Sequence, residues 1–76
     1  MTIEEVKKYL KTSFQNGVYV DLPHFRSPES IYITKNGSLF HVWHSRNQDG
    51  SHFHKVQPTT LMSSELADTR WQIRNL

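Results

Sequence analysis

The stretch "SIYITKNGSLFHVWHSR", residues 30–46, carries the clearest secondary-structure signal in the chain. Two runs rich in β-branched and aromatic residues flank Asn36 and Gly37, the pair preferred in two-residue type I′ hairpin turns. A loop made of these two residues alone sets Ile33 opposite Phe40. The same register pairs Tyr32 with His41 and Ile31 with Val42.

A second turn, "NQDG" at residues 47–50, leads into a third strand over residues 51–56. A four-residue loop here places Trp43 opposite His54 and His41 opposite Val56. Because paired residues share a face, we predict a core side made of Ile31, Ile33, Phe40, Val42 and Phe53. The other side then carries Tyr32, Leu39, His41, Trp43, His52 and His54.

An amphipathic helix is expected at the start of the chain. Thr2 can cap its free amide groups, and Glu4 and Glu5 follow in the first turn, where the helix dipole favours carboxylates. The spacing of the apolar residues puts one stripe on the sheet, formed by Ile3, Val6, Leu10 and Phe14. We expect Asn16-Gly17 to end the helix, since both residues tolerate a left-handed C-cap.

The remaining elements complete a single domain over residues 1–76. "VYVDL", residues 18–22, alternates as a strand, with Tyr19 and Asp21 facing away from its apolar side. Residues 23–30 form a loop between prolines. Near the end, one helical turn over residues 63–67 precedes an alternating strand at residues 70–74. The prediction is an α+β fold, with one N-terminal helix packed on a four- to five-stranded antiparallel sheet.

Composition narrows the functional classes. The 76 residues carry a net charge of +2 from dispersed lysines and arginines, which makes duplex DNA an unlikely partner. The chain has no cysteine and no long apolar run, so we expect a cytoplasmic protein that does not enter the membrane. A domain this small buries a modest share of its surface, and homo-oligomerisation would compensate for that.

The predicted face away from the helix holds Tyr32 and Trp43, and a monomer seldom leaves such a patch bare. A second subunit, a ligand with flat rings or the segment around Trp71 could cover it. Aromatic rings beside cations can stack bases and contact phosphate. Arg70 is a further cation that could meet a phosphate. The candidate ligand-binding residues are Tyr32, His41, Trp43, His54, Arg26, Arg46 and Phe25, the last as the lip of the proline-bounded loop.

The histidines invite a metal site, but the predicted register sets His41 opposite Val56, and no nearby carboxylate completes a ligand set. Ser45 and His52 are cross-strand neighbours, yet no third residue would make them a catalytic triad. We therefore expect no metal, no cofactor and no enzymatic activity.

The two ends of the chain, "TIEEVKKYLKTS" (residues 2–13) and "LMSSELADTRWQI" (residues 61–73), resemble small phage proteins of the signal-sequestering Thoeris anti-defence type. The matching closing pattern consists of Ser64, Glu65, Leu66, Ala67, Trp71 and Ile73. The resemblance implies a helix before a strongly bent antiparallel sheet. It also implies a homo-oligomer that captures a cyclic nucleotide-type immune signal without turning it over. No ligand-binding residue is carried over from the family.

Two other functions fit the same residues. A protein-binding inhibitor or adaptor of a host enzyme would dock through the aromatic face or an open sheet edge. A single-stranded nucleic-acid binder would show affinity that falls steeply with salt.

Overall fold

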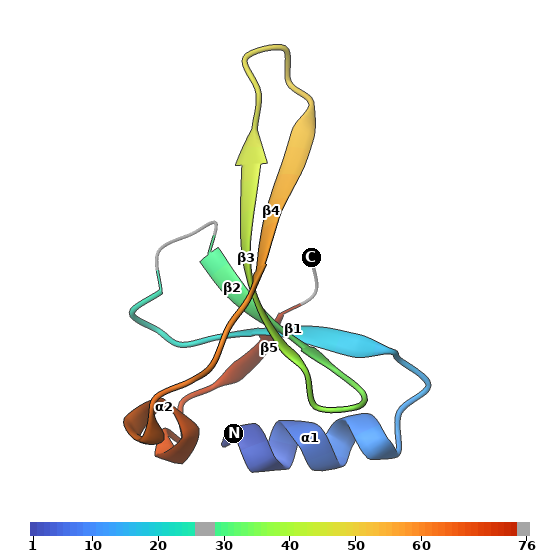
Figure 1. The fold of residues 1–76 in the computed structure, drawn as a ribbon, viewed down its shortest axis with the longest axis vertical. Coiled ribbons are helices and arrows are strands. Elements are labelled where there is room, and N and C mark those ends of the chain that lie inside the picture. Colours follow the sequence, from blue (N-terminus) through green and yellow to red (C-terminus); the bar gives the residue numbers. More distant parts are fainter. Residues whose placement is uncertain (26–28, 75–76) are drawn as a thin grey trace.

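A five-stranded antiparallel sheet and two helices make up the fold in the computed structural model (Figure 1). The structure describes residues 1–25 and 29–74, with the backbone alone at residues 45, 46, 52 and 53. The sheet order is β4-β3-β2-β1-β5, which confirms the predicted α+β class. Along the chain, the elements are α1 (Ile3–Lys11), β1 (Gly17–Asp21), β2 (Glu29–Thr34), β3 (Leu39–Arg46), β4 (His52–Pro58), α2 (Ser63–Ala67) and β5 (Gln72–Arg74).

Helix α1 begins as predicted and ends early. Thr2 and Glu5 form a reciprocal capping box, which satisfies two amide groups of the first turn. The helix stops at Lys11 because Thr12 turns back on Tyr9, with both its backbone N–H (3.3 Å) and its hydroxyl (3.1 Å) donating to the Tyr9 carbonyl. Hydroxyl side chains compete for helix carbonyls in this way.

Two predictions about the end of this helix are therefore wrong. Phe14 lies beyond the last turn and is fully exposed instead of joining the apolar stripe. Asn16-Gly17 does not cap the helix, because Gly17 already opens β1. The stripe consists of Ile3, Val6 and Leu10 alone, and all three residues are buried.

The core lies between α1 and one face of the sheet, here called the helix face. The α1 stripe packs in one buried cluster with Val18, Val20, Leu22, Ile31, Ile33 and Trp71. Burying each large side chain is worth about 1.5 to 3 kcal/mol, so this cluster is the main source of stability. Trp71 belongs to it, and the expectation that the Trp71 segment could cover the opposite face is therefore wrong.

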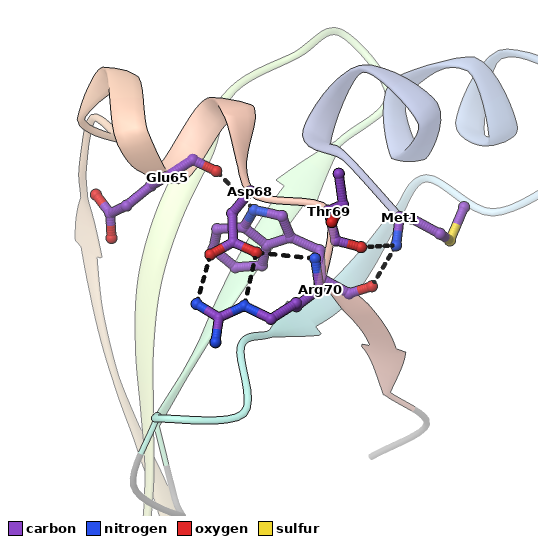
Figure 2. Close-up of polar contacts among 6 residues, drawn as sticks. Met1, Glu65, Asp68, Thr69 and Arg70 are labelled. Atoms are coloured by element: carbon purple, nitrogen blue, oxygen red, sulfur yellow. Dashed lines mark hydrogen bonds and ion pairs between the residues drawn. The ribbon is translucent and has the colours of Figure 1, made fainter.

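Hydrogen bonds join the first residue of the chain to the segment between α2 and β5 (Figure 2). The Trp71 indole N–H donates to the Glu65 carbonyl at 2.8 Å, so the buried ring has its polar atom satisfied. The amino group of Met1 donates to the carbonyl oxygens of Thr69 (2.8 Å) and Trp71 (2.9 Å). The start of α1 is thereby fixed beside the start of β5.

The first hairpin loop contains three residues, not the predicted two. Thr34 N–H donates to the Ser38 carbonyl at 2.9 Å, and Gly37 N–H donates to the Thr34 carbonyl at 2.9 Å. Gly37 has φ +91°, as in a type I turn followed by a bulge glycine. The Thr34 hydroxyl supports the longer loop by accepting a bond from Ser38 N–H and donating to the Asn36 side chain.

The second hairpin has a loop of the same type, with three residues and a bulge glycine. Asn47 N–H donates to the Ser51 carbonyl at 2.7 Å, Gly50 N–H donates to the Asn47 carbonyl at 3.0 Å, and Gly50 has φ +89°. Asp49 accepts bonds from both the N–H and the hydroxyl of Ser51. The predicted four-residue turn is one residue too long here, whereas the first predicted turn was one residue too short.

Both predicted registers are consequently wrong by one residue. Phe40 pairs with Tyr32 and not with Ile33, and Lys55 rather than His54 pairs with Trp43. A slip of one residue exchanges the two faces. Leu39, His41 and Trp43 therefore share the helix face with Ile31 and Ile33, whereas Phe40, Val42 and His44 share the other face with Tyr32. The predicted core position of Phe53 and the predicted face of His52 concern side chains outside the described residues.

Candidate functional site

The side of the sheet turned away from α1 is the candidate site, and we call it the open face. None of its described side chains belongs to the buried cluster beneath α1. Its central members are Tyr19, Tyr32, Phe40, Val42, His44, His54 and Val56. Val42 is buried, but the rings are half-buried or exposed, so they remain accessible to a ligand.

Four rings form a continuous row on this face. Tyr32 and Tyr19 stack with centroids 4.8 Å apart and planes 17° apart. The edge contacts continue from Tyr19 to His44 at 5.3 Å and from His44 to His54 at 4.6 Å. This ring row draws one side chain from each of β1, β2, β3 and β4, and it therefore crosses most of the sheet.

Two small residues make the ring row possible. Ser30 in β2 is buried on this face, and its hydroxyl lies 3.5 Å from His44 Nε2. Its short side chain lets Tyr19 in β1 reach His44 in β3 across the intervening strand. Gly17 lies against the Tyr32 ring, because a Cβ at this position would be only 2.4 Å from Tyr32 Cε2.

The charge of the ring row is set by its surroundings. Desolvation by burial lowers the pKa of His44 below its ordinary value of 6.5, and repulsion from His54 lowers it further. His44 is therefore a neutral ring at neutral pH. A neutral imidazole offers one donor and one acceptor to a ligand.

Arg74 supplies a positive charge beside the rings. It lies directly opposite Tyr19 on the open face, and its Nε donates to Asp21 Oδ2 at 2.6 Å. Its terminal nitrogens have no hydrogen-bond partner within residues 1–25 and 29–74. Asp21 thus fixes the guanidinium and leaves its outer edge available to an anion.

Arg70 differs from Arg74 in this respect. Its Nε and Nη2 donate to the two carboxylate oxygens of Asp68 at 3.0 and 2.8 Å (Figure 2). These bonds from Arg70 lower the pKa of Asp68 to about 2. The hypothesis that Arg70 meets a phosphate is weakened, because two of its guanidinium nitrogens already bond side by side to Asp68, whereas Arg74 uses only its Nε on Asp21.

The structure divides the predicted ligand-binding residues. Tyr32 and His54 lie on the open face, whereas His41 and Trp43 lie on the helix face. Phe25 is not an exposed lip, since it packs edge-on against Trp71 with centroids 5.6 Å apart and is partly buried against the core. Arg26 and the side chain of Arg46 lie outside the described residues.

On the helix face, Trp43 is already engaged. His41 stacks on it with centroids 4.0 Å apart and planes 14° apart, and Lys55 Nζ lies 5.5 Å above its ring. His41 Nε2 lies 3.3 Å from Glu29 Oε2 without forming a hydrogen bond, and it is shielded from solvent. Trp43 therefore offers less free ring surface than the sequence predicted.

Sequence reasoning missed Tyr19, His44 and Arg74 as site residues. The alternation in "VYVDL" and "RWQIR" places Tyr19 and Arg74 away from the apolar side of their strands. That signal could have marked both as surface residues, but it does not show that β1 and β5 are neighbours. His44 was missed because the register was wrong.

Wider comparisons leave the geometry as the main guide to function. Neither protein-family models, nor curated proteins, nor solved structures gave a match to this chain. Within the described residues, no three histidine, aspartate or glutamate side chains gather as a metal site would require. None of the described helices is long and apolar enough to cross a membrane.

Proposed function

We propose that this chain is a small non-catalytic binding protein whose open face captures a nucleotide-like ligand. The observation that carries the proposal is the position of Arg74 directly opposite Tyr19, a member of the ring row that stacks on Tyr32. One surface thus combines flat apolar rings with an outward-facing cation.

The chemistry of nucleotides matches this combination. A nucleobase stacked on an aromatic side chain gains about 1 to 3 kcal/mol. The planar fork of a guanidinium can give a phosphate two parallel hydrogen bonds. Because Asp21 already orients Arg74, little side-chain entropy is lost when a phosphate binds there.

The class of ligand is suggested by the chain ends. Their resemblance to signal-sequestering phage proteins supports a counter-defence role in which the ligand is a cyclic nucleotide-type immune signal. Such a protein acts in the cytoplasm of the infected cell and holds the signal without turning it over. The observed order of a helix followed by an antiparallel sheet agrees with the fold that the resemblance implies.

An oligomer fits the same proposal. The rings of the open face are only partly covered within one copy, and a ligand at an interface would have walls from two copies. Homo-oligomerisation would also add buried surface to a domain of modest size. The bound ligand would then lie between subunits, where its release is slow.

Isothermal titration calorimetry with a panel of cyclic and linear nucleotides tests the proposal. We expect one class of nucleotide to bind. Arg74→Gln should weaken its affinity at least tenfold, and Tyr19→Ala should weaken it because the stacking partner is removed. Arg70→Gln is the matched control, since Arg70 is also paired with an aspartate but lies away from the ring row. Titrations without heat throughout the panel, or equal losses in the two arginine variants, would refute the proposal.

The salt dependence of the affinity and a pull-down from host lysate separate the alternative functions. A single-stranded nucleic acid would bind with an affinity that falls steeply as salt rises. A small nucleotide held by one arginine would show a shallow salt dependence, because few counterions are released. A stoichiometric host protein recovered with the open face occupied would instead favour an inhibitor or adaptor.

A further inference from the structure

The two edges of the sheet differ in length. Among the described residues, β5 spans three, Gln72–Arg74, whereas β4 spans seven, His52–Pro58. A strand at an edge presents unpaired N–H and C=O groups to solvent, and proteins commonly blunt such edges by making them short. β5 is blunted in this way and β4 is not.

The ladder between β3 and β4 shows which groups of β4 point outward. The N–H of Thr59 donates to the Leu39 carbonyl at 3.1 Å, and the N–H of Asn47 donates to the Ser51 carbonyl at 2.7 Å. In an antiparallel pair, hydrogen-bonded positions alternate, so the odd-numbered residues of β4 bond to β3. The even-numbered residues direct their N–H and C=O groups away from the sheet. Pro58, which has no N–H, occupies one of these outward positions, as edge prolines do.

Val56 lies in the middle of the outward set. Its side chain is on the open face opposite the buried Val42 and is 57% exposed. Lysines often guard sheet edges against pairing, but Lys55 instead lies over the Trp43 ring on the helix face. Pro58 blunts the far end of this edge, but the outward N–H and C=O groups of His54 and Val56 have no such protection.

Within residues 1–25 and 29–74, no third strand pairs with the outer part of the β3–β4 hairpin. β2 begins at Glu29, which pairs with Trp43, so past this point β3 and β4 form a projecting ribbon of two strands (Figure 1). A two-stranded ribbon is marginally stable alone in water. Further strands alongside it would remove this weakness.

We propose that β4 pairs antiparallel with β4 of a second copy about a two-fold axis at Val56. In this register Val56 lies opposite its own copy, Lys55 opposite Gln57 and His54 opposite Pro58. The two Val56 residues exchange both bonds, whereas His54 N–H donates to the Pro58 carbonyl and Pro58 donates none in return. An axis at Lys55 would set two ammonium groups face to face, which is destabilising. A second copy fits this edge because the register sets the exposed Val56 against itself and brings no like charges face to face.

This pairing joins the two sheets and brings the two open faces onto one surface. The interface lies at the opposite edge of the sheet from β5 and Arg74, so it is separate from the ligand-binding interface of the proposed function, and it rests on the backbone of β4 and not on any ligand. Each property can therefore fail without the other.

Single cysteines test the register, since the chain contains none of its own. Hydrogen-bonded pairs in an antiparallel ladder have Cα atoms about 5.5 Å apart, within the range that a disulfide spans. Under mild oxidation without nucleotide, we expect Val56→Cys to cross-link at least tenfold faster than Phe14→Cys, whose position is fully exposed. Lys55→Cys should cross-link more slowly than Val56→Cys.

The native mass provides the second measurement. The unmodified chain should have the mass of a dimer, and Val56→Pro should be a monomer with an unchanged circular dichroism spectrum, because it removes only an outward N–H. Phe14→Ser, which removes an exposed ring elsewhere, should remain a dimer. A monomeric mass for the unmodified chain, together with cross-linking at position 56 no faster than at position 14, would overturn the proposal.

Discussion

The two faces of one sheet use their side chains differently. On the helix face, Val20 and Ile33 are completely buried and aliphatic, and they contact α1 and Trp71 within a single cluster. On the open face, the same strands carry Tyr19 and Tyr32, whose rings stay partly accessible. The helix face holds the fold together, whereas the open face has room for recognition.

The difference follows from the side chains themselves. Aliphatic side chains gain free energy from burial without needing a particular partner. Tyrosine and histidine combine an apolar ring with a polar group that seeks a hydrogen bond, so their complete burial is costly. Changes on the helix face should therefore reduce stability most, and changes on the open face should mainly alter the ring row.

The largest effect on stability is expected at Ile33. Ile33→Ala should lower the free energy of unfolding by about 2 to 5 kcal/mol, because it leaves a cavity beneath α1. Should this variant not fold, Ile33→Val should cost about 0.5 to 1.5 kcal/mol. Urea denaturation measures both, and a loss below about 0.5 kcal/mol for Ile33→Ala would show that the cluster is not the core.

A smaller effect is expected at Gly17 on the open face. An alanine Cβ would clash with the Tyr32 ring, and the end of that side chain can swing away. Gly17→Ala should cost about 1 kcal/mol in the free energy of unfolding while reducing the near-ultraviolet circular dichroism of the tyrosine stack. An unchanged spectrum would mean that Tyr32 does not lie against Gly17.

The pH dependence of stability probes His44. Because its pKa is lowered in the folded state, the unfolded chain takes up its proton more readily. The free energy of unfolding therefore keeps its full value above the ordinary His pKa of 6.5, and it decreases as the pH falls through and below that value. The free energy of unfolding should therefore be lower at about pH 5 than at about pH 7.5.

Urea midpoints at about pH 7.5 and about pH 5 measure this dependence. His44→Gln should have a flatter profile than the unmodified chain. His24→Gln is the matched control, since His24 is exposed and lies outside the ring row, and its profile should match that of the unmodified chain. Equal slopes in all three proteins would contradict the assignment to His44.

The smallest effect on stability is expected at the surface pair of Arg70 and Asp68. Exposed ion pairs contribute little to folding, so Arg70→Gln should leave the urea midpoint nearly unchanged. The pKa of Asp68 should nevertheless rise from about 2 towards its ordinary value, as an NMR titration of the carboxyl carbon would show. A pKa that stays near 2 would mean that Arg70 is not its cause.

Much of the fold could be predicted because its signals are local. The Thr2 cap, the apolar stripe at the start of α1, the alternation in β1 and the final helical turn and strand depend on residues close together in sequence. All are confirmed. The end of α1 was misjudged because hydroxyl residues after Lys11 end the helix before Asn16-Gly17.

The registers could not be predicted because each depends on which of two loop lengths the hairpin adopts. Asn36-Gly37 is typical of a two-residue turn, but its glycine also suits the bulge position of a three-residue loop, and the hydrogen bonds of the Thr34 side chain favour the longer loop. One added residue moved Trp43 to the helix face and His44 to the open face. The role of Arg74 could not be predicted for a related reason, since its place beside Tyr19 depends on β1 and β5 being neighbours.

The central claim is that ligand recognition belongs to the open face. An NMR titration of the chain with the cyclic nucleotide that binds most tightly tests it directly, by following side-chain resonances on both faces. We expect the largest shifts at Tyr19, His44 and Arg74, with Trp43 and His41 nearly unchanged. Large shifts confined to Trp43 and His41 would place recognition on the helix face and contradict the account.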